Sequence, residues 1–331
     1  MIRYLVCVFL LGLIACQQSR PVYTQLQGNA QGTTFSIVYK DTLGRDFSTS
    51  VDSIFRVIDR SMSLWDSTSI ISLLNANDPA VRADLHFTRV FRKAWEVSEQ
   101  TDGLFDCTVG PLVKAWGFSY KKNLPPPDSA QVESLRQLVG YHKVQLQNGK
   151  ITKANPQIQI DFNAIAQGYT VDVLADFLKG RGIKNYMIEV GGEVRAEGQN
   201  ERGEIWRIGI DKPINDSVAG RPLQAVVSLN GKSLATSGSY RKFVERNGQR
   251  YSHAIDPHTG FPITHNLLSI SVLAPDCMTA DAYATAFLVM GLEKAIPLAK
   301  EKGLEIYGIS SAQNGELTVY QSAGFKVAAE K

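Results

Sequence analysis

The sequence is poor in cysteine, with 4 in 331 residues. Cys7 lies in the N-terminal apolar segment and Cys16 directly follows it, so Cys107 and Cys277 remain for the folded part. There is no CxxC pair and no cluster of cysteine with histidine, so a cysteine-based metal site is not expected. Cys107 and Cys277 either form a disulfide in an oxidising compartment or stay two buried free thiols, and both alternatives are open.

A large net charge is also lacking. The 35 lysines and arginines nearly balance the 32 aspartates and glutamates, for a formal net charge of +3. There is no basic stripe and no nucleic-acid-binding motif, so nucleic acid is not expected as a partner. The content of 44% apolar and 20% charged residues is ordinary for a globular protein and argues against disorder. The length suffices for one large domain or two smaller ones.

The apolar segment at the N-terminus is too short for a comfortable membrane span. It runs from Tyr4 to Ile14, follows a short start containing Arg3, and leads into Ala15-Cys16. This order is typical of a bacterial lipobox, in which Cys16 is lipidated and becomes the first residue. We expect a signal peptide at residues 1–15, and a lipidated cysteine with a tether at residues 16–26. An ordinary cleaved signal peptide with a chance cysteine is the alternative.

Both interpretations place the mature protein outside the cytoplasm, and we expect a lipid anchor in a bacterial membrane. The inner membrane, with the protein facing the periplasm, is favoured. The outer membrane stays open, because Gln17 follows Cys16 in place of the aspartate of a simple inner-membrane retention signal.

Helical and extended patterns alternate along the rest of the chain without a regular βαβ period. Apolar spacing predicts helices over residues 52–60, 70–75, 88–100, 132–139, 276–287 and 292–302. Asn-Gly pairs at 148–149, 247–248 and 314–315 predict hairpins. Together they favour an α+β fold with mixed, largely antiparallel sheets and packed helices. We expect two intimately joined halves with the site between them, and a seam near residues 125–127 or 153–156.

An acidic residue stands where a predicted strand meets a predicted helix. Gln157–Ile160 alternates as a strand does, Asp161 follows, and Val173–Leu178 is apolar at helical spacing. The start of a helix offers free N–H groups and a partial positive charge, which suit a phosphate or a carboxylate. The alternative is that Asp161 simply caps the helix.

Near the C-terminus a helix carries two oxygen ligands on one face. Asp281 and Thr285 stand at i and i+4. A carboxylate and a hydroxyl together can hold a hard cation such as Mg²⁺, which prefers oxygen ligands and usually keeps waters and substrate phosphate as well.

Two irregular stretches contain residues suited to a ligand site. The segment Tyr251–Pro262 is dense in His, Asp, Gly and Pro, and irregular polar loops are frequent locations of sites. His253 leads into it and His258 lies in its turn; solvated loop histidines are the alternative. Trp65 either belongs to the core or stacks against a flat ring of a ligand. Together, Trp65 and Phe105 are candidates to sandwich a flavin or adenine ring.

Distinct motifs follow one another along the chain: Gly32–Thr34, Met62–Trp65, Gly103–Asp106 with Thr108–Pro111 and Trp116–Phe118, Asp161–Asp172, Gly191–Glu193, Thr236–Tyr240, His253–Gly260 and Ala280–Thr285. In this order they resemble the ApbE family of FAD:protein FMN transferases. The resemblance covers residues 27–325, essentially the whole mature chain.

The resemblance implies an activity, its cofactor and its partners. Family members split FAD with the help of Mg²⁺, transfer FMN through its phosphate to a Ser or Thr hydroxyl of a target protein, and release AMP. It implies acceptor flavoproteins such as subunits of sodium- or electron-translocating respiratory complexes.

The resemblance also implies site residues. The FAD contacts would be Gln31, Trp65, Leu104, Phe105, Asp106, Asp161, Gln167 and the segment from His253 to Ile255. The metal ligands would be Asp281, Thr285 and the backbone carbonyl of Ala164, joined by that of Ala284. We take His253 as the base that removes the proton of the acceptor hydroxyl, because an unperturbed histidine titrates at about pH 6.5.

One position departs from the family pattern. Gln167 stands where the family often has lysine, and glutamine offers a phosphate a hydrogen bond without a charge. Relatives with an acidic residue there exist, so function is not excluded. Trp65 agrees with the aromatic residue common in transferring members, whereas a small polar residue is associated with FAD-hydrolysing relatives. The alternatives to transfer are an FAD pyrophosphatase releasing FMN and AMP, and a non-catalytic flavin-binding lipoprotein.

Overall fold

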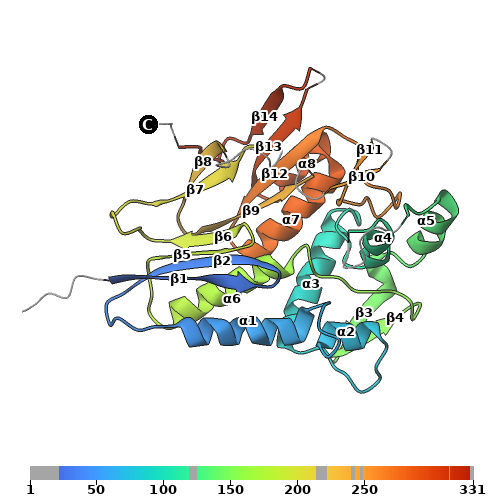
Figure 1. Cartoon of the computed structure of the whole chain (residues 1–331), viewed down its shortest axis with the longest axis horizontal. Helices are drawn as coiled ribbons and strands as arrows, with labels where there is room; N and C mark the ends of the chain where they lie inside the picture. Colours follow the sequence, from blue (N-terminus) through green and yellow to red (C-terminus); the bar gives the residue numbers. More distant parts are fainter. Residues whose placement is uncertain are drawn as a thin grey trace, which may run out of the picture.

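The computed structural model describes residues 22–118, 125–213, 222–239, 243–246, 249–312 and 314–328 (Figure 1). The predicted lipobox with Cys16 and the predicted turn at residues 247–248 lie outside these ranges. The tether prediction is wrong from Val22 onward, because β1 (Val22–Ala30) pairs along its whole length with β2 (Thr33–Asp41). In the described ranges, every helix is too short or too polar to cross a membrane.

A single antiparallel sheet of eight strands organises the part of the chain that the structure describes. Its order is β1-β2-β5-β6-β9-β12-β13-β14, and every neighbouring pair is antiparallel. The six further strands are β5 (Tyr186–Val190), β6 (Glu193–Glu197), β9 (Lys232–Gly238), β12 (Leu267–Ala274), β13 (Glu305–Ser311) and β14 (Leu317–Gln321). The α+β prediction is thereby confirmed, and β1 and β14, the first and last strands of the described chain, form the two edges of this sheet.

Helices and a hairpin pack against this sheet. Helix α6 (Ala166–Gly180) packs on β5 and β6, α7 (Cys277–Met290) on β9 and β12, and α8 (Leu292–Glu301) on β13, while α1 (Ser48–Met62) packs on α6 (Figure 1). The hairpin of β7 (Trp206–Asp211) and β8 (Leu223–Leu229) shares a separate core cluster with residues of β2, β6, β9, β12 and β13.

The chain between α1 and α6 forms a second part, here called the insert (residues 63–165). It contains α2 (Ile70–Asn75), α3 (Leu85–Gln100), α4 (Gly110–Ala115), α5 (Ser129–Arg136), a 3₁₀ turn (Tyr141–Lys143), and the hairpin of β3 (Val144–Gln147) and β4 (Lys150–Lys153). The hairpin predicted at residues 148–149 is confirmed. The predicted seams at residues 125–127 and 153–156 are wrong, because both lie within the insert. A short hairpin of β10 (Phe243–Arg246) and β11 (Gln249–Ser252) comes later in the chain.

The predicted strand at Gln157–Ile160 is wrong. Gln157 lies in a turn and the next three residues belong to no helix or strand, although Ile158 and Ile160 are fully buried as the alternation requires. The segment has no strand partner among the described residues, because the backbone N–H and C=O of Ile160 pair with the side chain of Asn75.

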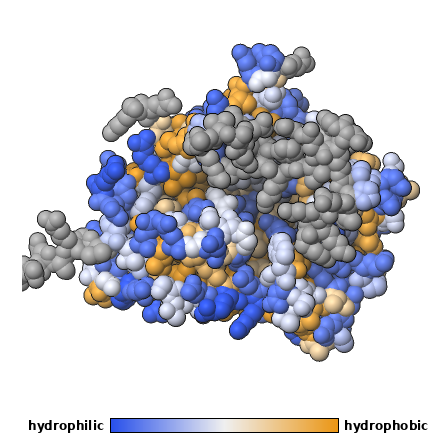
Figure 2. Space-filling model, in the orientation of Figure 1, coloured by the Kyte–Doolittle hydropathy of each residue, from blue (hydrophilic) through white to orange (hydrophobic). Residues whose placement is uncertain are grey.

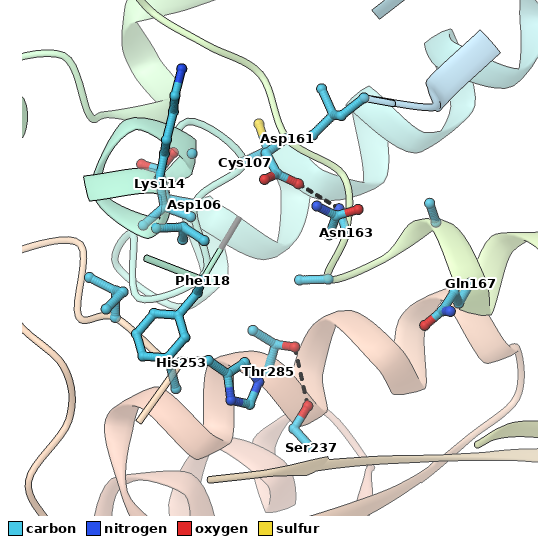
Figure 3. A pocket seen from close by; sticks show the side chains of 18 of the residues that line it. Asp106, Cys107, Lys114, Phe118, Asp161, Asn163, Gln167, Ser237, His253 and Thr285 are labelled. Atoms are coloured by element: carbon cyan, nitrogen blue, oxygen red, sulfur yellow. Dashed lines mark hydrogen bonds between the residues drawn. The ribbon is translucent and has the colours of Figure 1, made fainter. Parts of the chain in front are cut away.

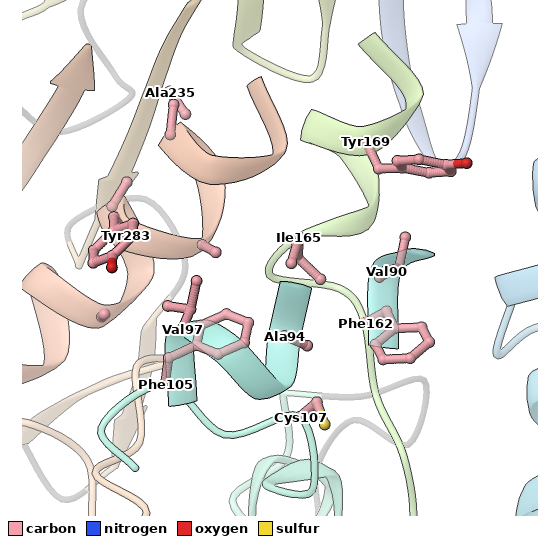
Figure 4. Packing of buried hydrophobic residues seen from close by; sticks show 14 of the residues in the cluster. Val90, Ala94, Val97, Phe105, Cys107, Phe162, Ile165, Tyr169, Ala235 and Tyr283 are labelled. Carbon is pink, nitrogen blue, oxygen red and sulfur yellow. The ribbon is translucent and has the colours of Figure 1, made fainter. Parts of the chain in front are cut away.

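The largest hydrophobic cluster joins the insert to the helices on the sheet (Figure 4). Helix α3 contributes residues at helical spacing, including Val90, Ala94 and Val97, and these pack with Phe162, Tyr283 and their neighbours. Fully burying one such large side chain stabilises a fold by about 1.5–3 kcal/mol. The two parts are therefore held firmly together.

Both cysteines of the described chain are buried free thiols, which settles the alternatives left open by the sequence. Burial raises the pKa of each thiol well above its ordinary value. On the face shown in Figure 2, polar and hydrophobic residues are interspersed, as is usual for a folded domain.

Candidate active site

A cavity of about 2680 Å³ lies between the insert and the sheet with its helix α7 (Figure 3). The insert contributes its α1–α2 connector and the loop after α3, while the other wall comes from the ends of β5, β6 and β9 and from α7. Nearly all site residues predicted from the sequence line this cavity: Gln31, Trp65, Leu104, Phe105, Asp106, Asp161, Ala164, Gln167, His253, Ile255, Asp281 and Thr285. Ala284, whose carbonyl was a further predicted ligand, is not among the lining residues. The expectation of two joined parts with the site between them is met, although the parts are not consecutive halves.

Helix α7 presents Asp281 and Thr285 to the cavity. Asp281 Oδ2 accepts a hydrogen bond of 3.0 Å from the N–H of Gly168 in α6. The Thr285 hydroxyl lies 3.2 Å from that of Ser237 in β9 (Figure 3). Burial raises the pKa of Asp281 to about 7; the Gly168 N–H opposes this shift and the nearby Asp172 carboxylate adds to it. The site therefore contains a carboxylate whose negative charge is poorly solvated.

These donors fit a hard divalent cation. Asp281 and Thr285 offer a carboxylate and a hydroxyl, and Ala164 lines the same cavity and can offer its carbonyl. Within the described ranges, no three residues of the types His, Cys, Asp and Glu are grouped as metal ligands. One carboxylate with neutral oxygens and space for water suits Mg²⁺ better than zinc. A bound cation would also relieve the buried charge of Asp281.

Asp161 is held in a turn and does not cap α6. Its N–H donates to the carbonyl of Cys107 over 2.7 Å, and its Oδ1 accepts the N–H of Asn163 over 2.8 Å (Figure 3). Helix α6 begins later, at Ala166, and its N-cap residue Ile165 makes no capping bond with its side chain. Burial raises the pKa of Asp161. The helix-capping alternative is therefore wrong, and this half-buried carboxylate lines the cavity.

Asn75 fixes the backbone immediately before Asp161. Its Nδ2 donates to the Ile160 carbonyl over 2.8 Å, and its Oδ1 accepts the Ile160 N–H over 2.7 Å. Asn75 is buried, so its side chain takes the place of a neighbouring strand for this residue. The segment thus reaches the cavity in one defined position.

We expect Asn75→Ala to destabilise the protein by about 2–4 kcal/mol, because it leaves a buried N–H and a buried C=O of Ile160 unpaired. Urea unfolding followed by circular dichroism measures this loss. Gln157→Ala changes an exposed residue of the same segment and is expected to stay within about 0.5 kcal/mol of the wild type. Equal effects of the two substitutions would contradict the role given to Asn75.

The loop after α3 is held by the carboxylate of Asp106. Asp106 Oδ1 accepts the N–H and the hydroxyl of Thr108, over 2.7 and 2.6 Å, and Oδ2 accepts the N–H of Tyr141 over 2.8 Å. These bonds use its side chain within the protein, so a ligand contact at Leu104–Asp106 falls mainly to the backbone of the loop.

The two predicted ring-binding aromatics differ in their surroundings. Trp65 is 68% exposed and lines the cavity, whereas Phe105 is 3% exposed and packs in the main core (Figure 4). Phe105 also lines the cavity, and its contact with a ring of FAD stays a prediction. Because its ring packs mostly in the core, it offers a ligand much less surface than Trp65 does.

The polar loop after β11 separates its two histidines. His253 lines the cavity, with its ring centroid 6.3 Å from that of Phe118 in an edge-on arrangement (Figure 3). His258 is exposed and is not among the residues that line the cavity. Ile255 packs in a small cluster with Leu112 and Trp116, and Trp116 Nε1 donates to the carbonyl of Gly260 over 2.8 Å. Helices α4 and α5 thereby position the loop that carries His253.

Gln167, in the first turn of α6, packs against the turn between β5 and β6. Gly191 in that turn has a φ of +69°, and a Cβ on it would lie 2.8 Å from Gln167 Nε2. Glycine is required at this position by both its backbone conformation and the close approach of the glutamine.

Sequence reasoning missed several polar residues of the site, among them Asn75, Ser237 and Asp59. Ser237 belongs to a recognised motif, but its contact with Thr285 spans two distant elements. Asp59 of α1 lines the cavity, and burial raises its pKa while a bond from Gln31 opposes the shift. Asp59 has no distinguishing sequence signal, because it stands among other polar residues of an amphipathic helix.

Comparison with known proteins shows which family the chain belongs to. The model of the ApbE family matches residues 31–307, which is most of the chain. The chain belongs to the ApbE family. A family relative from Haemophilus influenzae named "FAD:protein FMN transferase" is 37% identical, and the match covers 97% of this chain and 96% of the relative.

Solved structures of the ApbE family share the fold. The flavin transferase ApbE from Vibrio cholerae superposes with a TM-score of 0.83 at 33% identity, covering 92% of this chain and 99% of that one. The apo form of the Pseudomonas stutzeri flavinyl transferase ApbE gives a TM-score of 0.82 at 31% identity, covering 92% and 95%. As a member of this family the protein is a transferase.

Proposed function

We propose that the protein is an Mg²⁺-dependent FAD:protein FMN transferase. It would move FMN from FAD to a Ser or Thr hydroxyl of a target protein and release AMP. The observation that carries this proposal is the pair formed by the buried Asp281 and the half-buried Thr285, which offers a cation site in the same cavity as Trp65, Asp161 and His253. The relatives named as FAD:protein FMN transferases support it.

The residues that would hold Mg²⁺ are Asp281 and Thr285 with the backbone carbonyl of Ala164; the family resemblance adds that of Ala284. When bound, Mg²⁺ supplies charge neutralisation at the pyrophosphate, where negative charge develops on the leaving AMP. Asp281 is a poor candidate for the base in this arrangement, because a cation would stabilise its ionised form.

The bonds formed and broken in FMN transfer suggest roles for the other residues of the cavity. The acceptor hydroxyl oxygen attacks the phosphorus of the FMN half, and the phosphoanhydride bond to AMP breaks. His253 lines the cavity and is the proposed base that takes the hydroxyl proton. Trp65, exposed in the cavity, offers a face for one flat ring of FAD. Gln167 would offer a hydrogen bond to a phosphate without a charge.

Transfer is tested by mass spectrometry of a candidate acceptor incubated with FAD, Mg²⁺ and the chain from Gln17 onward. We expect the acceptor to gain the mass of one FMN on a Ser or Thr, and EDTA to abolish this gain. His253→Ala is expected to slow transfer by about 10²–10⁴-fold, the usual contribution of a general base. His258→Ala is the matched control, because His258 lies in the same loop outside the cavity, and it should transfer at nearly the wild-type rate.

The other outcomes separate the competing functions. Free FMN and AMP with every acceptor unmodified would indicate an FAD pyrophosphatase. Intact FAD bound to the protein without AMP release would indicate a non-catalytic flavin-binding protein. If His253→Ala transferred FMN at the wild-type rate, only the assignment of His253 as the base would be contradicted. The proposed transferase function would stand.

We further propose that Cys16 is lipidated and anchors the protein to a bacterial membrane outside the cytoplasm, with the inner membrane favoured. Because β1 begins at Val22, only residues 17–21 separate Cys16 from the sheet. An extended chain spans about 3.5 Å per residue, so a lipid on Cys16 would keep the start of β1 within roughly 20 Å of the membrane surface. This placement suits acceptors such as subunits of sodium- or electron-translocating respiratory complexes. Release of Cys16→Ser from the membrane fraction would support the anchor.

A further inference from the structure

The carboxylate of Asp172 joins three elements next to the proposed metal site. It lies on α6, and its two oxygens accept the N–H groups of Cys277 and Met278, at 3.0 and 2.9 Å, which open helix α7. Arg195 of β6 contacts the same carboxylate, with Nη1 2.5 Å from Oδ1. The side chains of Asp172 and Arg195 are 13% and 15% exposed, so this contact is largely shielded from water.

Helix α7 already has a cap of its own. Asp276 at its N-cap accepts the N–H of Thr279 over 2.8 Å. The first N–H groups of a helix have no partner within the helix, and Asp276 satisfies one of them from the same chain segment. Asp172 satisfies two others from a different helix. A bond between helices fixes their relative position, whereas a local cap does not.

The same two helices meet again at Asp281, one turn further along α7. Gly168, one turn before Asp172 in α6, donates its N–H to Asp281 Oδ2 over 3.0 Å. A Cβ on Gly168 would lie 2.4 Å from the carbonyl oxygen of Cys277, so the two backbones are in close contact here. A shift of α7 along α6 would therefore break the contacts at Asp172 and at Asp281 together.

We propose that Asp172, oriented by Arg195, is a positioning residue that sets the register of α7 against α6 and thereby aims Asp281 and Thr285 into the cavity. This inference rests on the proposed function where it concerns the metal. Asp172 is not among the residues that line the cavity, so it acts through α7 and touches no substrate.

One test measures Mn²⁺ binding by electron paramagnetic resonance on the full chain in detergent, without FAD. We expect Asp172→Ala to weaken Mn²⁺ binding by about 10–100-fold, as is typical when a group supporting a metal ligand is removed. Asp276→Ala is the matched control, because it removes a carboxylate from the same helix end and leaves the contact between helices intact. It is expected to lower the Tm while Mn²⁺ affinity stays within about twofold of the wild type.

A second measurement does not depend on the metal. Gly168 is in the first turn of α6, where an N–H has no partner within the helix, so its protection from hydrogen exchange depends on Asp281. In metal-free protein, we expect its amide to exchange at least about tenfold faster in Asp172→Ala and at the wild-type rate in Asp276→Ala.

The two measurements separate this inference from the proposed function. Wild-type Mn²⁺ affinity and unchanged Gly168 exchange in Asp172→Ala would overturn the positioning role and leave the transferase proposal intact. Faster Gly168 exchange in Asp172→Ala, in a protein whose wild type binds no Mn²⁺ even with FAD, would support the positioning role and overturn the metal-dependent function. Equal losses of Mn²⁺ affinity in Asp172→Ala and Asp276→Ala would mean that Asp172 acts only as a helix cap. That result would overturn the proposal.

Discussion

Replacing Asp281 with asparagine is expected to abolish FMN transfer and, at the same time, to raise the Tm of the metal-free protein above pH 7. Asparagine keeps the shape of the side chain and an oxygen that can accept the N–H of Gly168. It removes the negative charge that a hard cation requires. The catalytic site would thus be lost while the fold is relieved of a buried charge.

The pH dependence of this stabilisation follows from the direction of the pKa shift. Burial raises the pKa of Asp281 from its ordinary value of 3.8 to about 7 in the fold. The ionised carboxylate therefore costs stability, and this cost is absent below about pH 4, grows as the pH rises, and is complete above about pH 7. The gain in Tm for Asp281→Asn should accordingly be several degrees at pH 8 and close to zero at pH 4.

Thermal unfolding in EDTA at pH 4 and pH 8, with acceptor mass measured in parallel, tests both parts. Mg²⁺ is expected to raise the Tm of the wild type and to leave that of Asp281→Asn unchanged. Asp276→Asn removes a charge from the N-cap of the same helix, where asparagine caps as well as aspartate does, and serves as the control. Transfer by Asp281→Asn at the wild-type rate would refute the assignment of Asp281 to the metal site.

Replacing Gly168 with alanine is expected to destabilise the protein by about 1–3 kcal/mol and to reduce transfer by at least tenfold. The added Cβ would stand 2.4 Å from the carbonyl oxygen of Cys277 and 2.8 Å from Asp281 Cβ. These are contacts with backbone and with the root of a side chain, so helices α6 and α7 must separate to admit it. The separation would lengthen the bond from Gly168 to Asp281 and displace the proposed metal ligands.

Helix α6 offers a matched control for this substitution. Gly180 ends the same helix, and a Cβ placed on it meets no atom within 4 Å. Gly180→Ala should therefore be neutral or stabilising by up to about 1 kcal/mol, because alanine favours helix more than glycine does. Urea unfolding and acceptor mass distinguish the two variants. If Gly168→Ala unfolded at the same urea concentration as wild type, the close approach of α6 and α7 would be wrong.

Much of the local structure could be predicted because it depends on neighbouring residues. The spacing of Val90, Ala94 and Val97 predicted α3, and the Asn-Gly pair at residues 148–149 predicted the turn between β3 and β4. The segment Gln157–Ile160 shows the limit of such patterns. Its alternation correctly predicted buried isoleucines, but only the side chain of a distant asparagine decides that it is not a strand.

The residue types of the site were also visible in the sequence, whereas their surroundings were not. The sequence did not show that the ring of Phe105 packs mostly in the core. It also left Asp161 as a candidate helix cap, whereas its carboxylate accepts a hydrogen bond within its own turn. The tether was expected to reach residue 26, but Val22–Leu26 pair with β2. In each case the deciding partner is remote in sequence or belongs to a strand that local patterns do not place.

The sequence by itself determined which chemistry the chain can offer. Asp281 and Thr285 share one face of their helix however the helix packs in the fold, because their spacing matches the helical repeat. Only the tertiary structure decided what surrounds them: Gly168, 113 residues away, binds Asp281, and Asp172 holds the start of the same helix. The raised pKa of Asp281 is likewise a tertiary property, because it comes from burial, and burial depends on how distant segments pack.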